Sequence, residues 1–158
     1  MKSLVAYFSA TGNTRKLAEN LSKAAGADLF EIEPMKVYSE KDLDWHDDKS
    51  RSSVEMKDKS SRPEIKKKIE NMSDYKNIFI GFPIWWYTAP RIINTFLESY
   101  DFSGKVIIPF ATSGSSEMGD ISKSLKEVCN GNADFKEGKR FGSYDISSLK
   151  NWINSLNI

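Results

Sequence analysis

Three short, almost continuously apolar runs constrain the fold of this chain more than any other feature. They cover residues 4–8, 78–82 and 106–111. An unbroken apolar run of this length is typical of a strand buried on both faces, whereas a strand with one solvated face alternates apolar and polar residues. Such strands occur mainly in parallel sheets with helices on both sides. The runs therefore predict strands of a parallel sheet.

The segments between and after these runs have the spacing of amphipathic helices, with one apolar stripe each. The stripes are Leu17, Ala18, Leu21 and Ala25, then Ile92, Ile93, Phe96 and Leu97, then Leu149, Trp152, Ile153 and Leu156. A further helix is expected around residues 121–128, a second strand around residues 29–32 and a weaker fifth strand within residues 133–141. Strands that alternate with helices predict the α/β class.

Pro109 lies inside one of the expected central strands. Proline has no N–H group, so it removes one hydrogen bond from the ladder of a sheet. We therefore expect this strand to contain an irregularity or to turn its proline toward an unpaired side.

The chain has 158 residues, which is the usual size of one domain. We expect a single domain, residues 1–158, with a charged excursion at residues 38–62. About half of the residues from 40 to 62 are charged, and the few apolar ones have no sustained period. Loops of this length are usually functional or poorly ordered. A solvated loop is the expectation, with Trp45 and His46 as the residues that could cover a ligand.

Composition excludes several classes of protein. The 23 Lys and Arg residues nearly balance the 22 Asp and Glu residues, so the chain has no basic surplus that would indicate nucleic acid binding. The single cysteine, Cys129, cannot form an internal disulfide, which suits a reducing compartment. The first apolar run is too short for a signal peptide or a membrane span. We expect a cytoplasmic protein without membrane or nucleic acid partners.

The loop after the first strand has the composition of a phosphate-binding site. It consists of Ser9, Ala10, Thr11, Gly12, Asn13 and Thr14, and the first helix is expected to begin near Asn13. A helix N-terminus offers unpaired N–H groups and the positive end of the helix dipole. Hydroxyl groups can add donors, and glycine lets the backbone approach the ligand closely. The alternative is a turn in which Asn13 or Thr11 only caps the helix.

Other phosphate-binding loops do not match this segment. It has one glycine and no lysine before the threonine, so it is not a nucleotide-triphosphate loop of the Walker type. The G-x-G-x-x-G pattern of dinucleotide-binding proteins is also absent. A cysteine-dependent phosphatase needs a cysteine near position 9, and a phosphoryl-accepting receiver domain needs acidic residues at the strand ends; Ser9 fits neither. The phosphate would be held by neutral donors, with Arg15 as a possible helper.

In the loop of residues 9–14 the sequence resembles the flavodoxin family, in which a Ser/Thr-rich loop with a glycine follows the first strand and binds the phosphate of FMN. Two more loops match, and the resemblance extends from Met1 to about Lys126. The segment after residues 78–82 resembles the family's first flavin-ring loop, and the segment after residues 106–111 resembles the second. The similarity is greatest to short flavodoxin-like proteins without a large insertion in the last strand. The residues of these two loops are Pro83, Ile84, Trp85, Trp86, Tyr87, Thr88, Ala89 and Pro90, then Thr112, Ser113, Gly114, Ser115, Ser116, Glu117, Met118 and Gly119.

The resemblance implies a flavodoxin-like three-layer sandwich with a five-stranded parallel sheet in the order 2-1-3-4-5. In that order all three loops meet at the carboxyl edge of the sheet, beside the topological switch point. The cofactor implied is FMN, with its ring against Trp85 or Trp86 and its polar edge at backbone groups of residues 112–115. The alternative for the aromatic loop is a core or partner-binding patch. The expected cofactor-binding residues are Ser9, Thr11, Gly12, Asn13, Thr14, Pro83, Ile84, Trp85, Trp86, Thr112, Ser113, Gly114 and Ser115.

The family implies electron transfer or a small oxidoreductase activity, in which the flavin performs the chemistry and no catalytic side chain or metal is needed. The expected partners are a redox protein, or NAD(P)H with a small quinone-like acceptor. Trp86 and Tyr87 stand where electron carriers of the family generally have a glycine. In those carriers the glycine peptide can flip to offer its carbonyl to the protonated flavin N5, which stabilises the one-electron-reduced flavin. Because positive φ costs Trp86 and Tyr87 more than glycine, the loop disfavours this flip and favours a two-electron centre. A non-catalytic module that keeps the fold but binds another phosphate ligand or a partner remains the alternative.

Overall fold

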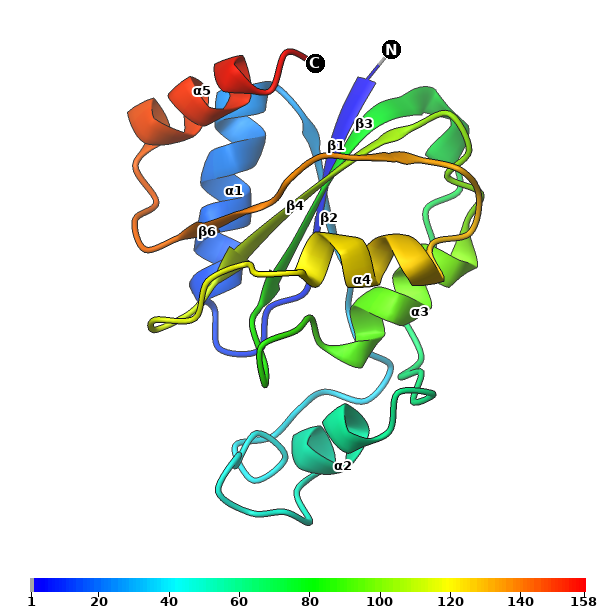
Figure 1. Cartoon of the computed structure of the whole chain (residues 1–158), viewed down its shortest axis with the longest axis vertical. Helices are drawn as coiled ribbons and strands as arrows, with labels where there is room; N and C mark the ends of the chain where they lie inside the picture. Colours follow the sequence, from blue (N-terminus) through cyan, green and yellow to red (C-terminus); the bar gives the residue numbers. More distant parts are fainter. Residues whose placement is uncertain (1) are drawn as a thin grey trace.

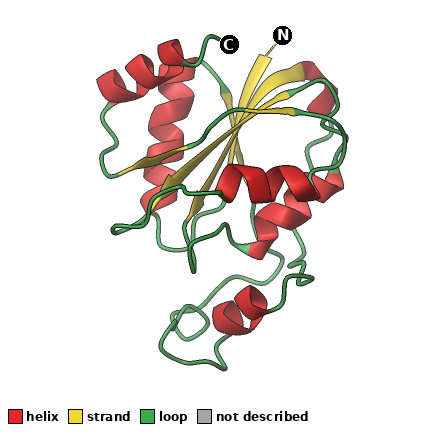
Figure 2. Ribbon diagram, viewed as in Figure 1, coloured by secondary structure: helices red, strands yellow, loops and turns green. Residues whose placement is uncertain are grey.

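The computed structural model describes residues 2–158 and contains one parallel sheet between two layers of helices (Figures 1 and 2). The strands are β1 (Lys2–Tyr7), β2 (Asp28–Glu31), β3 (Tyr75–Pro83), β4 (Val106–Thr112), β5 (Asp134–Phe135) and β6 (Lys139–Phe141). The helices are α1 (Asn13–Ala25), α2 (Arg51–Lys57), α3 (Arg91–Ser99), α4 (Ile121–Val128) and α5 (Ile146–Ser155), with a short 3-10 helix at Met72–Asp74. The strand order is β2-β1-β3-β4-β5, and every pair is parallel. The α/β class and the order 2-1-3-4-5 are confirmed.

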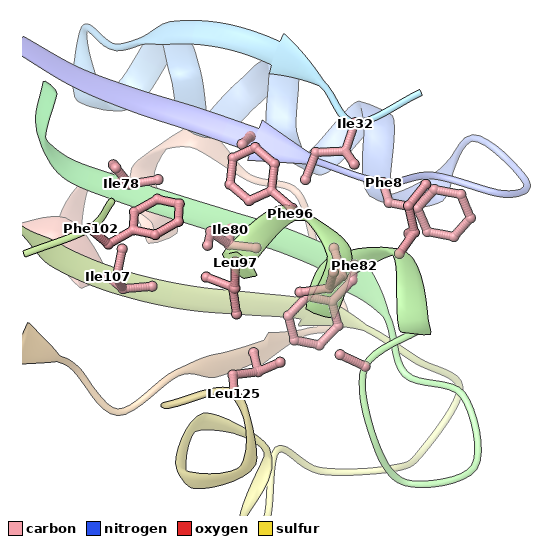
Figure 3. Close-up of a cluster of buried hydrophobic side chains, with 14 of the residues drawn as sticks. Phe8, Ile32, Ile78, Ile80, Phe82, Phe96, Leu97, Phe102, Ile107 and Leu125 are labelled. Atoms are coloured by element: carbon pink, nitrogen blue, oxygen red, sulfur yellow. The ribbon is translucent and has the colours of Figure 1, made fainter. Parts of the chain in front are cut away.

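Both faces of the sheet are buried, which explains the continuous apolar runs. In β3, Ile78 and Ile80 face α3 and α4, while Phe79 between them faces α1 and α5. Figure 3 shows the first of these two clusters, in which Phe96 and Leu97 of α3 pack against the sheet. Because successive side chains of a strand point to opposite faces, helices on both sides require apolar residues at every position.

The fifth strand position is divided into β5 and β6, and Pro109 explains the division. The carbonyl of Ile107 accepts a hydrogen bond from the Lys136 N–H (2.9 Å), so the backbone of Ile107 faces this strand position. Two residues further on, Pro109 faces the same side without an N–H to donate. There the ladder is interrupted, and a Cβ on Gly138 would lie 2.8 Å from the Pro109 carbonyl oxygen. The expected irregularity is therefore located where β5 ends and β6 has not begun.

The excursion, residues 38–62, projects beyond the carboxyl edge of the sheet (Figure 1). Short antiparallel pairing joins the chain on either side of it, with the Met35 N–H donating to the Glu64 carbonyl and the Lys66 N–H to the Glu33 carbonyl (both 2.8 Å). The excursion contains α2, which the apolar spacing did not predict.

Contacts with other elements hold α2 in place. Ser50 caps its N-terminus by accepting the Ser53 N–H (3.3 Å). At its other end, Arg91 from the start of α3 donates to the carbonyls of Glu55 (3.3 Å) and Met56 (2.8 Å). These long-range hydrogen bonds give the short helix support that its sequence alone does not provide.

Among residues 2–158, no helix has both the length and the apolar character needed to cross a bilayer.

Candidate functional site

The loop between β1 and α1 presents unpaired backbone donors. Gly12 precedes the helix with φ of 99°, a left-handed conformation that glycine adopts without strain. Neither Thr11 nor Asn13 caps the helix; instead Ser9 Oγ accepts the N–H groups of Gly12 (3.1 Å) and Arg15 (3.2 Å). The N–H groups of Asn13 and Thr11 have no hydrogen-bond acceptor among residues 2–158. The structure thus favours an open anion-binding terminus over the capping alternative.

Thr112 joins the three predicted loops. Its Oγ1 lies 2.8 Å from Oγ1 of Thr14 in the first turn of α1, and both side chains are buried. Its carbonyl accepts a hydrogen bond from the Ile84 N–H (3.0 Å) in the loop after β3. The three loops therefore share one junction at the carboxyl edge of the sheet, where β1, β3 and β4 lie side by side.

Trp85 is fixed in the loop after β3 by two other aromatic rings. The ring centroids of Phe8 and Tyr38 lie 5.7 Å and 5.6 Å from that of Trp85, both in edge-to-face geometry. The Arg51 guanidinium lies 3.8 Å from the Tyr38 ring centroid, and the Tyr38 hydroxyl donates to the Glu55 carboxylate. Burial, with the neighbouring Glu55, raises the pKa of Tyr38 above its ordinary value, so the phenol stays protonated. Tyr38 thus connects the excursion to the candidate site.

The two residues after Trp85 form a strained turn. Trp86 and Tyr87 have φ values of 46° and 64°. Trp85 and Thr88 exchange both of their backbone hydrogen bonds around them (2.9 and 3.0 Å), as in a two-residue hairpin of type I′. Such turns usually contain Asn or Gly. The expectation of a two-electron centre rests on the cost of positive φ at these residues. The structure shows that the folded chain already bears that cost, and the two-electron behaviour stays a prediction.

Arg140 of β6 holds the loop after β4. Its guanidinium donates to Ser113 Oγ (3.1 Å) and to the carbonyls of Ser113 and Gly114 (3.0 Å each). The Ser113 hydroxyl in turn donates to the Ser116 carbonyl. Arg140 is half-buried, so these contacts restrain the backbone at the carboxyl end of β4.

Cavities between described residues also lie away from this junction. One, of about 300 Å³, is lined by Leu29 and by Tyr75 at the start of β3. The other, of about 360 Å³, is lined by Lys105 and by Val106 at the start of β4. Both are at the amino-terminal ends of strands and are separate from the junction of the three loops.

Comparison with known proteins identifies the family. The family model described as Flavodoxin matches residues 2–156. The chain belongs to the flavodoxin family. No protein with a curated description matches the sequence significantly.

Solved structures of flavodoxin-like proteins have the same architecture. A candidate flavoprotein from Bacteroides eggerthii is 46% identical, with a TM-score of 0.93 over 99% of this chain and 98% of its own. A second, from Bacteroides uniformis, is 48% identical, with a TM-score of 0.85 and 97% of each chain covered. A flavoprotein from Lactobacillus acidophilus, solved in complex with FMN, is 21% identical, with a TM-score of 0.71 over 96% of this chain and 98% of its own. The last similarity is one of fold.

Within this flavodoxin-family fold, the predicted residues have unequal roles. Thr14, Ile84 and Thr112 are brought together at the junction, whereas Trp86 is 44% exposed on its strained turn. Arg15 forms an ion pair with Glu31 (2.9 Å) and so is engaged at the end of β2. The remaining predicted residues lie in the loops at the carboxyl ends of β1, β3 and β4, and they are Ser9, Thr11, Gly12, Asn13, Pro83, Trp85, Ser113, Gly114 and Ser115.

Sequence reasoning missed two residues that shape the site, Tyr38 and Arg140. Tyr38 is an isolated aromatic at the start of a charged segment, and Arg140 is one basic residue among many. Nothing in the local pattern distinguishes either, because their partners are 47 and 27 residues away in the chain. Trp45 and His46, the two residues of the excursion that could cover a ligand, stack on one another with ring centroids 3.7 Å apart.

Proposed function

We propose that this protein binds FMN, with its phosphate at residues 9–14, and works in electron transfer or as a small oxidoreductase. The observation that carries the proposal is the start of α1, where the N–H groups of Thr11 and Asn13 have no acceptor among residues 2–158, next to the junction of the three loops around Thr112. Family membership and the FMN complex of the Lactobacillus acidophilus protein support the choice of cofactor.

The first loop suits a phosphate dianion. The amides of Thr11 and Asn13 have no acceptor in the part of the chain that the structure describes, and the α1 dipole adds positive potential at the same place. A Cβ built on Gly12 meets no atom of the described residues within 4 Å, so the space in front of this glycine is open to a ligand. The Ser9 and Thr11 hydroxyls can donate further hydrogen bonds, since a hydroxyl that accepts still has its proton to give. The residues present therefore fit a phosphate held by neutral donors.

The other two loops suit a flat ring with one polar edge. Trp85 offers an aromatic surface whose orientation is fixed by Phe8 and Tyr38, and stacking on such a ring contributes on the order of 1 kcal/mol beyond burial. The backbone of residues 113–115 offers hydrogen-bonding groups on an exposed loop. Bound FMN would supply the redox chemistry, while the chain binds and orients it.

The electron partner distinguishes the two versions of this function. A carrier would exchange electrons with a redox protein, and a reductase would take hydride from NAD(P)H and reduce a small quinone-like acceptor. None of the predicted cofactor-binding residues has a titratable side chain, so none of them would act as a catalytic acid or base, and the flavin would carry the redox chemistry in both versions.

The test is to titrate the purified apo-protein with FMN and to follow flavin fluorescence and absorption. We expect stoichiometric binding and a yellow complex. NADPH is then added to the complex with and without a quinone acceptor. Rapid oxidation of NADPH without any partner protein would identify the reductase, and its absence would favour the carrier. A protein that takes up no FMN would contradict the proposal and favour the non-catalytic module.

A further inference from the structure

Arg140 is half-buried, and its hydrogen-bond partners are all neutral. All three contacts of its guanidinium are with neutral oxygens of Ser113 and Gly114. No carboxylate lies within ion-pair distance of it in the part of the chain that the structure describes. The planar guanidinium is well suited to a bidentate pair with a carboxylate or phosphate, and here it binds neutral oxygens instead. The positive charge at this loop is therefore left without a compensating anion.

The three hydrogen bonds from the Arg140 guanidinium also fix the direction of two backbone amides. In a trans peptide the C=O and the following N–H point in opposite directions. The carbonyls of Ser113 and Gly114 point at Arg140, so the N–H groups of Gly114 and Ser115 point away from it. Neither amide has an acceptor within residues 2–158, and both residues are exposed. The loop thus presents two adjacent donors, with a cation on their opposite side.

Two aligned donors backed by a positive charge bind an electron-rich group more tightly than a neutral one. We propose that Arg140 is a positioning residue that orients the amides of Gly114 and Ser115 and biases the site toward the reduced, more electron-rich flavin. This inference rests on the proposed binding of FMN. It assigns to Arg140 the tuning of the flavin's reduction potential, because tighter binding of the reduced form raises that potential.

The test compares three variants. Arg140→Gln removes both the positive charge and the planar set of guanidinium donors. Arg140→Lys keeps the charge but loses the planar donor geometry. Lys139→Gln is the matched control, because it removes one positive charge from the neighbouring exposed position of β6. The affinity of each protein for oxidised FMN and the midpoint potential of each complex are measured. The backbone order parameters of residues 113–116 in the FMN-free protein are measured by NMR, which requires no flavin.

For Arg140→Gln we expect affinity for oxidised FMN to fall about tenfold and affinity for reduced FMN about a hundredfold, so that the potential falls. Order parameters of residues 113–116 fall as well. Arg140→Lys keeps the charge but loses the geometry that orients the amides, so its potential falls between those of the wild type and Arg140→Gln, and Lys139→Gln behaves as wild type. A purely structural role for Arg140 would weaken both redox forms equally and leave the potential unchanged.

An unchanged potential in Arg140→Gln would overturn the inference, even if affinity fell. If that variant does not fold, an unchanged potential in Arg140→Lys would overturn it, because the side-chain geometry that orients the amides is then lost without effect. Failure of the wild-type protein to bind FMN at all would instead contradict the proposed function, so the two failures are distinguishable.

Discussion

Replacing Tyr87 by glycine should stabilise the protein. Tyr87 has φ of 64° in the turn after Trp85, and its side chain is 83% exposed. A residue with a Cβ in this region is crowded by its own backbone, whereas glycine adopts it freely. Because the phenol ring is mostly in solvent, its removal forfeits little apolar burial.

The magnitude follows from two opposing terms. The left-handed conformation costs an L-residue roughly 1–2 kcal/mol, and glycine loses about 0.5–1 kcal/mol more conformational entropy on folding. The difference predicts that Tyr87→Gly raises the free energy of unfolding by about 0.5–1 kcal/mol. For a chain of this size that corresponds to an increase of about 1–4 °C in the melting temperature.

Urea denaturation of the FMN-free protein, followed by far-UV circular dichroism, measures this difference. Tyr87→Ala is the matched control, because it also removes the phenol but keeps a Cβ and therefore the strain. We expect Tyr87→Ala to remain within about 0.5 kcal/mol of wild type and Tyr87→Gly to be clearly more stable than it. Equal stability of the two variants would refute the view that the turn stores strain, which is typical of backbone outliers at functional sites.

Three further outcomes are expected. Thr14→Val leaves the buried Thr112 hydroxyl unpaired and lowers the free energy of unfolding by about 1–2 kcal/mol in urea denaturation. Arg91→Gln removes the hydrogen bonds to the last carbonyls of α2 and accelerates amide exchange in Arg51–Lys57, but not in β3, in hydrogen-exchange mass spectrometry. Burial, with the nearby Asp101, raises the pKa of the Cys129 thiol to about 11. At pH 8 it should therefore react with iodoacetamide more slowly than free cysteine, with a rate that keeps rising above pH 9 as thiolate forms. Reaction as fast as that of free cysteine would contradict this.

The strands of the sheet were predictable because their signals are strong and local, whereas their order was implied by the resemblance to the flavodoxin family. The apolar runs at residues 4–8, 78–82 and 106–111 coincide with β1, β3 and β4. Helices α1, α3 and α5 contain the apolar stripes that the spacing indicated, since packing on one face of a sheet imposes the 3.6-residue period. Even the irregularity at Pro109 was predictable, because a missing N–H has a definite structural consequence.

The features that sequence reasoning missed depend on partners distant in the chain. Helix α2 is held by Arg91, and Tyr38 is held by Phe8 and Trp85. The positive φ of Trp86 and Tyr87 contradicts their local preference, and tertiary context overrides it. Residues 9–14, 83–86 and 112–115 could be placed at one edge because strand order alone brings them there, whereas the junction at Thr112 depends on side-chain positions that no sequence period encodes.

The central claim is that residues 9–14 hold the phosphate of FMN. The most direct test is to compare the dissociation constants of FMN and riboflavin for the wild-type apo-protein by fluorescence titration. Riboflavin keeps the ring and lacks the phosphate, so the free amides of Thr11 and Asn13 lose their charged acceptor. Loss of two or more charge-assisted hydrogen bonds, at about 1.5–3 kcal/mol each, predicts binding at least a hundredfold weaker. Comparable dissociation constants for the two flavins would contradict the account.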